Sequence, residues 1–282
     1  MKKITGGHTM AMTKELAALV DANPLTITDN ELTFMLDHIG DPDGHLRDGI
    51  IYTLFGRGFF DDGFTADQRA EVAQTVLDRR DLWRDIEKAD TDAIFGRTFT
   101  ALVGTLILDY DREHSFLTVA QRTAYFQWAV TYLQQEKDYR GYVSGHGWAH
   151  AVAHGADFLG AAVRHPQFSQ KLVPDVQKSV VTVLRRMTAP FMDDEEQRLA
   201  AALVFGLTVG NISVQEWTDW LTIEHTYLWD NYANDNLPSY YRLSAWLRIM
   251  QNAYFLLPQR DPNRVSCLAF INDFYQQMGF RG

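Results

Sequence analysis

Helix-start signals recur along this chain, whereas the alternation of apolar and polar residues that marks half-buried strands is almost absent. A Ser or Thr followed three residues later by Glu or Gln can satisfy two backbone amides at once, an arrangement called the capping box. Four such pairs open an amphipathic stretch: Thr28 with Glu31, Thr65 with Gln68, Thr118 with Gln121, and Ser213 with Glu216. Prolines and glycine-containing turns separate the amphipathic stretches that follow. The pattern predicts an all-α protein of about a dozen helices.

Arginines accompanied by an acidic residue recur near the predicted helix starts, at intervals of 43 to 58 residues. The pairs are Asp43/Arg47, Asp92/Arg97, Glu136/Arg140 and Asp194/Arg198. Helical hairpins of the HEAT type repeat every ~40–47 residues and stack into a curved layer with one concave face. We therefore expect a HEAT-like α-α superhelix, a right-handed array of antiparallel helical hairpins, with a closed α/α toroid as the alternative. Capping and local pairing would also explain any single pair.

Length and composition set the domain organisation and exclude several classes of protein. The 282 residues carry 26 Lys and Arg against 36 Asp and Glu, a net charge of −10, and 46% of them are hydrophobic. This length fits residues 13–282 as a single all-helical domain of about six hairpins, after a disordered leader over residues 1–12. The acidic balance argues against a nucleic-acid partner, because such binding requires a basic face.

The cellular compartment and the kind of metal ligand can be predicted from the scarcity of membrane-spanning, signal-peptide and cysteine features in the chain. Its most apolar run, Ala101 to Leu108, is far shorter than the ~20 residues of a membrane-spanning helix, so no membrane partner is expected. The N-terminus has no signal-peptide pattern, which predicts a cytoplasmic protein. The single cysteine, Cys267, lies in an apolar context and is expected to be a buried thiol. Any bound metal would therefore be held by nitrogen and oxygen ligands.

The segment 136–157 contains three of the nine histidines within nine residues. His146, His150 and His154 stand four residues apart, so on a continuous helix they would form one stripe that drifts by ~40° per step. Asp157 would lie at nearly the same angle as His146 and could orient a histidine through an i, i+3 contact. The spacing therefore predicts a helix over this segment with its imidazoles on one face.

Three interpretations of the stripe are open on the sequence. Buried histidines could bond to neighbouring carboxylates and carbonyls and hold hairpins together. The imidazoles, with Arg97 and Arg140, could line a polar pocket for a polar or anionic ligand. One histidine could be a general base, or a metal ligand beside a carboxylate such as Asp138, because a pKa near ~6.5 suits proton transfer at neutral pH. No nucleophile motif accompanies the cluster, and His146 and His154 would lie ~12 Å apart along the helix axis, too far to share one ion.

A second cluster is aromatic and lies between residues 217 and 246, interleaved with Asp and Asn side chains. Its members are Trp217, Trp220, Tyr227, Trp229, Tyr232, Tyr240, Tyr241 and Trp246. Flat rings beside carboxylates and amides suit sugar or peptide binding. Aromatic residues at helical spacing more often form the core, since each buries a large apolar area, and we expect these rings to be core.

Two stretches of the histidine segment, Glu136 to Val143 and Gly147 to Asp157, resemble the central signature of the domain of unknown function 2785 family, found in Gram-positive bacteria. Other similar stretches, around Arg47, Arg97 and Arg198, extend the resemblance over roughly residues 30–280. It implies an all-helical, HEAT-like fold and no assigned reaction. The positions that match the family are Arg47, Asp48, Arg97, Asp138, Arg140, Trp148, His150, His154 and Asp157. Relatives have a lysine where this chain has His146, which shifts the predicted site to His150, His154 and Asp157.

We predict a scaffold that binds a ligand or partner through a polar His/Arg/Asp pocket on its concave face. The ligand would be a small polar or anionic molecule, and the alternative partner is a protein; no cofactor is expected. The residues predicted to bind it are Arg97, Asp138, Arg140, Trp148, His150, His154 and Asp157. The alternative is a hydrolase-like enzyme that uses His150 or His154 with a carboxylate, with or without a metal held by these two histidines. The leading interpretation has no metal.

Overall fold

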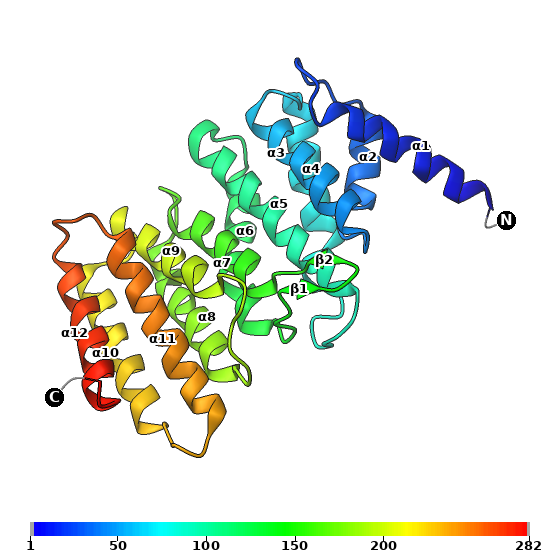
Figure 1. Ribbon diagram of the computed structural model, residues 1–282. Helices are drawn as coiled ribbons and strands as arrows, with labels where there is room; N and C mark the ends of the chain where they lie inside the picture. The colour runs from blue at the N-terminus through cyan, green and yellow to red at the C-terminus, as the bar shows by residue number, and fades with distance from the viewer. Residues whose placement is uncertain (1–2, 281–282) are drawn as a thin grey trace. The chain divides into compact units, whose positions relative to one another are not determined.

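The computed structural model describes residues 3–280, with side chains from residue 9 onward. Within these residues twelve α-helices account for nearly all the regular structure, and the only sheet is a two-stranded hairpin (Figure 1). The predicted all-α class is confirmed. The right-handed HEAT-like arrangement and the toroid alternative stay predictions.

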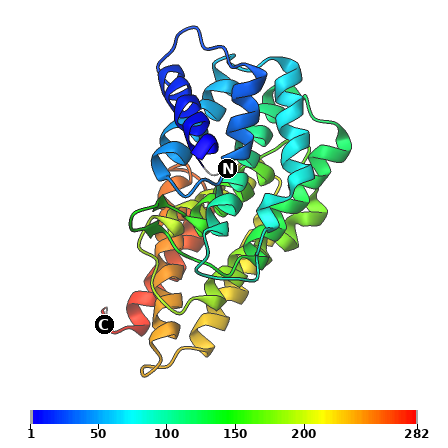
Figure 2. The same cartoon turned by 90° about the vertical axis from the view of Figure 1, so that its right-hand side faces the viewer.

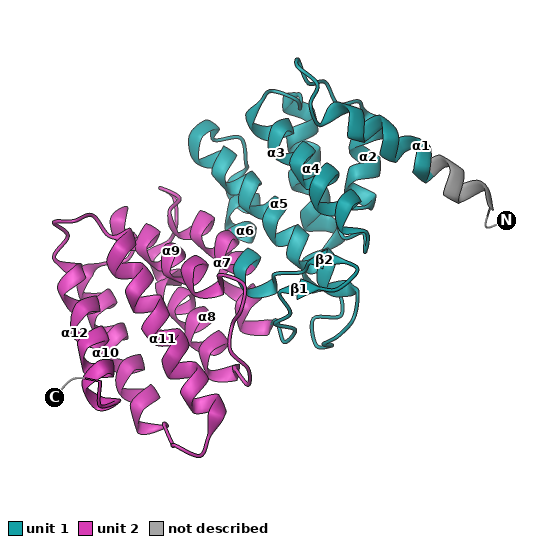
Figure 3. Ribbon diagram, viewed as in Figure 1, with its two compact units in different colours: residues 1–125, 136–154 teal, residues 126–135, 155–282 magenta. Residues whose placement is uncertain are grey.

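The chain divides into two compact units (Figure 3). Unit 1 comprises residues 1–125 and 136–154, and unit 2 comprises residues 126–135 and 155–282. The chain therefore enters unit 2 for residues 126–135, returns to unit 1 for residues 136–154, and completes unit 2 from residue 155 onward. The single folding domain over residues 13–282 stays a prediction.

Unit 1 contains the more irregular secondary structure. Its elements up to the hairpin are α1 (Lys3–Leu19), α2 (Asp29–Asp37), the π-helix η1 (His45–Tyr52), α3 (Thr53–Phe60), α4 (Ala66–Arg79), the 3-10 helix η2 (Asp81–Trp83), α5 (Ala93–His114), β1 (Tyr142–Val143) and β2 (Gly147–Trp148). Helix α1 overlaps the leader over residues 1–12 that was expected to be disordered, and the first two residues of that leader lie outside the described residues. The side chains of Met12 and Leu16 in α1 are buried, which anchors the helix. Helix α6 (Val119–Gln135) crosses the boundary after residue 125.

Unit 2 is built almost entirely of regular helices. They are α7 (Ala151–Val163), which begins in unit 1, the 3-10 helix η3 (Gln170–Leu172), α8 (Val173–Arg186), α9 (Glu195–Thr208), α10 (Val214–Asp230), α11 (Leu237–Leu256) and α12 (Asn263–Gln277). Helix α11 packs against α9, α10 and α12, and the last three helices run side by side in both views (Figures 1 and 2).

All four predicted capping boxes form. In each, the Ser or Thr hydroxyl accepts from the backbone amide three residues on, and the Glu or Gln side chain accepts from the amide of the Ser or Thr. They open α2, α4, α6 and α10. These helix starts are local features, so a sequence pattern of four residues determines them.

Helix α5 is the core helix of unit 1. Its 22 residues are long and apolar enough to cross a membrane by length and composition, with a mean hydropathy of 1.2. However, 78% of its most apolar 18-residue stretch is buried inside the structure, as in the core helix of a soluble protein. The apolar run therefore extends well beyond Ala101–Leu108 and serves packing. Cytoplasmic location stays a prediction.

Three of the eight rings in the aromatic cluster of unit 2 are buried in the core, as predicted, and the other five are half-buried or exposed. Trp217, Trp220 and Trp246 are 1%, 7% and 2% exposed. The rings of Trp220 and Trp246 meet edge to face at 5.7 Å between centroids. Trp229 and Tyr240 are more exposed, so the two faces of the cluster differ.

Candidate functional site

The histidine segment does not fold as one helix. After α6 ends at Gln135 the chain forms an irregular stretch and the β1–β2 hairpin, and it becomes helical again only at Ala151. His146 lies in the turn between the strands, His150 precedes α7 with a φ of 52°, and only His154 is on a helix. The predicted stripe of three imidazoles on one helix face is therefore wrong.

Glycine explains why the helix fails to form. Gly145 and Gly147 both have a φ of 80°, a left-handed conformation that glycine adopts without steric cost. This conformation allows the tight turn of the hairpin, and glycine is a poor helix former. The turn also packs closely on its neighbour, since a Cβ on Gly44 would lie 2.5 Å from the carbonyl oxygen of His146. The i, i+4 spacing of the histidines is thus coincidental to the local fold.

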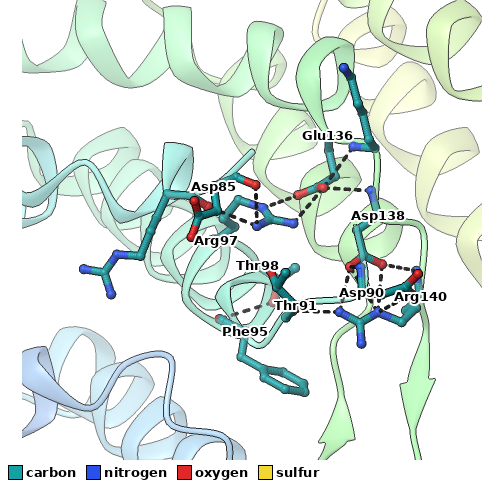
Figure 4. A network of polar contacts seen from close by, with 11 residues as sticks. Asp85, Asp90, Thr91, Phe95, Arg97, Thr98, Glu136, Asp138 and Arg140 are labelled. Atoms are coloured by element: carbon teal, nitrogen blue, oxygen red, sulfur yellow. Dashed lines mark hydrogen bonds and ion pairs between the residues drawn. The ribbon is translucent and has the colours of Figure 1, made fainter. Parts of the chain in front are cut away.

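Arg97 and Glu136 form a buried ion pair at the start of this segment (Figure 4). Both side chains are 0% exposed, and the guanidinium donates from Nε at 2.7 Å and from Nη2 at 2.9 Å to the two carboxylate oxygens. Glu136 Oε1 also accepts from the backbone amides of Lys137 and Asp138, each at 2.9 Å. Arg97 thus fixes the segment to α5 and has its charge matched inside the protein.

Arg140 pairs with Asp138 in the same network (Figure 4). Its Nη2 donates to Asp138 Oδ2 at 2.6 Å and to the carbonyl of Thr91 at 2.7 Å, while Asp138 Oδ2 accepts from the amide of Asp90 at 2.9 Å. The hydrogen bond with Asp138 raises the pKa of Arg140. Two of the predicted ligand-binding cations, Arg97 and Arg140, therefore pair with carboxylates of the histidine segment.

Arg47 anchors the hairpin from the π-helix. Its side chain is 0% exposed and donates to three carbonyl oxygens: those of Asp41 at 2.5 Å, His146 at 2.8 Å and Trp148 at 2.9 Å. The guanidinium also lies over the ring of Phe95, 4.1 Å from its centroid. Burial lowers the pKa of Arg47, against the opposing effect of nearby carboxylates.

The structure does bring part of the predicted site together. The rings of Trp148 and His150 stack at 4.3 Å with an interplanar angle of 20°, and His150 meets His154 edge to face at 5.4 Å. The imidazole of His154 in turn meets Phe99 at 5.3 Å. His150 and His154 are 9% and 8% exposed, whereas Trp148 is half-buried. We call Asp48, Trp148, His150 and His154 the imidazole cluster.

Asp48 is the acidic member of this cluster and comes from the π-helix, next to Arg47. Burial raises the pKa of its carboxyl, and the charges of Arg47 and His150 partly offset that rise. A half-buried carboxyl with a raised pKa beside an imidazole is a combination that can transfer protons. Two further features occur here that are frequent at functional sites: a π-helix, and a non-glycine residue with positive φ.

The predicted site residue Asp157 lies in unit 2. Its Oδ2 accepts from Arg198 Nη1 at 2.7 Å, and Arg198 also pairs with Asp194 at 3.3 Å. Asp157 therefore pairs with an arginine 41 residues further along the chain.

A cavity of about 730 Å³ lies elsewhere in unit 1, around the end of α2 and the start of α5. His38 and Asp41 face each other there, with Nδ1 and Oδ2 2.8 Å apart, and Asp92 also lines it. A Cβ on Gly40 would lie 2.3 Å from the Cα of Gly96, so the two backbones can meet here only because residue 40 has no side chain. Neither His38 nor Asp92 is among the residues that the sequence predicts to bind a ligand.

The fold and the imidazole cluster define a class of protein: an all-α protein in which buried arginines hold an irregular segment that carries aromatic and imidazole rings. The sequence model of one family matches residues 82–255, and its description is "Protein of unknown function (DUF2785)". The chain belongs to this family, as the resemblance implied. The matched region contains the whole histidine segment, whereas Arg47 and Asp48 precede it. The comparisons with curated proteins and with solved structures gave no match.

Proposed function

We propose that this protein binds a small polar ligand at the imidazole cluster of unit 1. The observation that carries the proposal is the placement of His150. Its backbone is held in a left-handed conformation, its ring stacks on the half-buried Trp148, and its charge acts on the carboxyl of Asp48. Positive φ on a residue other than glycine costs free energy, and such strain persists where the surroundings impose it.

The surroundings that impose this conformation are backbone hydrogen bonds. The amide of His150 donates to the carbonyl of Gly141 at 3.1 Å, and its own carbonyl accepts from the amide of His154 at 2.8 Å. Arg47 holds the carbonyl of Trp148 at the same point. The imidazole therefore has a fixed position before any ligand arrives, and a preorganised group loses less entropy on binding.

The charges favour a polar ligand over a strongly anionic one. Arg97 is matched by Glu136 and Arg140 by Asp138, while Arg47 donates to backbone carbonyls. The cluster itself offers imidazole nitrogens, a carboxyl that burial keeps protonated to a higher pH, and the face of an indole ring. Hydroxyl, amide or carboxylic-acid groups on a flat molecule would suit these partners.

The test is mass spectrometry of small molecules that copurify with the native protein. His150→Asn should abolish copurification, because asparagine tolerates positive φ and preserves the backbone while it removes the imidazole. The matched control is His114→Asn, at an exposed histidine that ends α5 and stacks on Tyr110. Equal recovery of a molecule from both variants, with both folded by circular dichroism, would refute binding at the cluster. Trp148→Phe should weaken binding without abolishing it.

A hydrolase-like activity is the second candidate, favoured by the electrostatic coupling of Asp48 and His150. In this version Asp48 supplies a proton as general acid and His150 accepts one as general base. A panel of chromogenic esters, phosphoesters and glycosides tests it. Asp48→Asn should reduce the rate by about a hundredfold or more if the carboxyl transfers a proton. The metal-assisted form predicts at least one equivalent of a transition metal, by elemental analysis of protein purified without a histidine tag.

A cytoplasmic location and a protein partner in place of the small ligand also belong to the binding proposal. Cell fractionation would test the location, and a pull-down would test the partner.

A further inference from the structure

A groove between α10 and α12 in unit 2 has the chemistry of a cation site. It encloses about 540 Å³ and is lined by Thr222, His225, Thr226, Trp229, Asp230, Ala269, Phe270, Asp273 and Gln277. Aromatic rings and two carboxylates are present, and none of these nine residues is a lysine or an arginine. The aromatic cluster of the sequence thus has one face in the core and one half-buried face, at Trp229, on this groove.

The hydrogen bonds of His225 determine its protonation. Trp246 Nε1 approaches His225 Nδ1 at 3.2 Å, and an indole N–H can only donate. His225 Nδ1 therefore accepts, so the proton of the ring is on Nε2, which donates to Asp273 Oδ2 at 2.7 Å. With one nitrogen accepting, the imidazole is neutral and does not cancel the charge of Asp273.

The carboxylate of Asp273 is both oriented and accessible. Gln277 Nε2 donates to the same oxygen, Oδ2, at 2.6 Å, and the side chain of Asp273 is 39% exposed. Its other oxygen, Oδ1, has no hydrogen bond within residues 3–280. Asp230 is exposed at the same groove and has no ion-pair partner in the described part of the chain. The groove therefore carries negative charge without an internal counter-ion.

Aromatic rings flank these carboxylates. The ring of Phe270 lies 4.5 Å from that of His225, and the ring of Trp229 lies 6.3 Å from that of His225. The face of an aromatic ring attracts a cation through its quadrupole, most strongly for tryptophan. An alkyl chain also gains from contact with the rings, because that contact removes apolar surface from water.

We propose that this groove binds an alkylammonium group, with the cation near Asp273 and Asp230 and the alkyl chain against Trp229 and Phe270. The site is separate from the imidazole cluster and does not depend on it. A free amine and a lysine side chain carry the same group, so the experiment includes a probe for each.

The experiment is an NMR titration of the full-length protein labelled with ¹⁵N at its seven tryptophans. The indole resonance of Trp229 is assigned by Trp229→Phe, and n-hexylammonium chloride, its neutral counterpart n-hexanol and methyl glucoside are added separately. We expect a saturable shift of the Trp229 resonance with hexylammonium only. A lysine-containing peptide that binds tighter than hexylammonium identifies a lysine side chain as the natural source, and weaker binding identifies a free amine.

Charge removal provides the decisive comparison. Asp230→Asn and Asp273→Asn should each weaken hexylammonium binding by about threefold to fivefold. The matched control is Asp219→Asn on the same helix, where an exposed carboxylate accepts from Gln215 outside the groove and makes the same change in net charge. Unchanged affinity in Asp230→Asn, which should leave the fold intact because its side chain is exposed, would overturn the proposal. So would equal binding of hexanol, binding of the glucoside instead, or no saturable shift.

Discussion

Buried charge is used differently in the two units. In unit 1 the pair Arg97–Glu136 has both side chains 0% exposed. In unit 2 the comparable pair Arg248–Glu196 has a 4% exposed carboxylate, but the arginine side chain is 40% exposed. Both pairs have short contacts, at 2.7 Å and 2.6 Å, and each joins residues far apart in the sequence. They differ in whether the cation can reach water.

This difference follows from the kind of backbone that each pair supports. Glu196 lies in the first turn of α9, a regular helix in which all but the first few backbone amides are satisfied by the helix's own hydrogen bonds. Glu136 begins a stretch without regular structure, and its carboxylate accepts from two backbone amides as well as from Arg97. An irregular segment inside a protein must find side-chain partners for its amides and carbonyls. The Arg97–Glu136 pair therefore supports an irregular backbone with buried charge, whereas most of the backbone that follows Glu196 is satisfied by helical hydrogen bonds.

The largest expected effect is the loss of Glu136. Glu136→Gln leaves Arg97 buried without a counter-ion and should lower the free energy of unfolding by about 3–5 kcal/mol. Glu196→Gln leaves an arginine that water can solvate, so the loss should be about 1 kcal/mol. Urea denaturation followed by circular dichroism measures both. Similar losses in the two variants would break the comparison. Arg97→Met combined with Glu136→Met should recover part of the stability, because no charge is left buried although the amides of Lys137 and Asp138 lose their acceptor.

Arg47 gives the next largest effect, through three carbonyls that only a guanidinium can reach together. Arg47→Lys has a single ammonium and should cost about 2–3 kcal/mol. The amides of Ala149 and His150, which donate to Gly141, should then exchange hydrogen faster. The control in unit 2 is Arg242→Lys, which loses one bond of 3.3 Å to a carbonyl and should cost well under that amount. Unchanged exchange at Ala149 would mean that the hairpin does not depend on Arg47.

These two regions also separate what the sequence could and could not predict. The capping boxes at Thr28, Thr65, Thr118 and Ser213 were predictable because each depends on four consecutive residues. The partner of Arg97 was not, because it lies 39 residues away, and the local pattern had offered Asp92 instead. A local rule cannot identify contacts that tertiary packing selects.

The histidine segment shows the same limit at the candidate site. Its composition marked His150 and His154 for attention, and the structure does bring their rings together. The spacing, however, predicted one helix, whereas the positive φ of Gly145 and Gly147 directs a hairpin. Asp48, more than a hundred residues before His150, was known only through family resemblance. The pair His225–Asp273 was missed, since 48 residues separate them and neither lies in a motif.

The third effect is a gain of stability at Asp48. Burial raises the pKa of this carboxyl above its ordinary value of 3.8, so folding favours the protonated form. Its contribution to stability is therefore fully present below the unfolded-state pKa and is lost as the pH rises through the folded-state pKa. Asp48→Asn, which mimics the neutral form, should raise the melting temperature at pH 7, and the difference should shrink as the pH falls towards 4.

Glu224 in unit 2 is the counterpart for this test, because burial raises its pKa too and Arg185 opposes the rise. Glu224→Gln should show no gain at pH 7, since it gives up a pair whose Nη2 to Oε2 distance is 2.6 Å. The gain at Asp48 should be smaller than the losses at Glu136 and Arg47. A lower melting temperature for Asp48→Asn at pH 7 would mean that attraction to Arg47 and His150 outweighs burial.

The smallest expected effect concerns Cys267 in unit 2, whose thiol should not react with an alkylating reagent in the native protein. This thiol is buried among regular helices, and burial raises its pKa to about 12, so at pH 8 only about one molecule in ten thousand carries the reactive thiolate. Iodoacetamide should leave the native protein unmodified by mass spectrometry over an hour and add one group in guanidinium. Glu196→Gln should increase the slow native rate by no more than about fivefold, because its cost of about 1 kcal/mol limits how much more often unit 2 opens. Rapid labelling of the native protein would show that the helices around Cys267 open far more easily than their regular packing indicates.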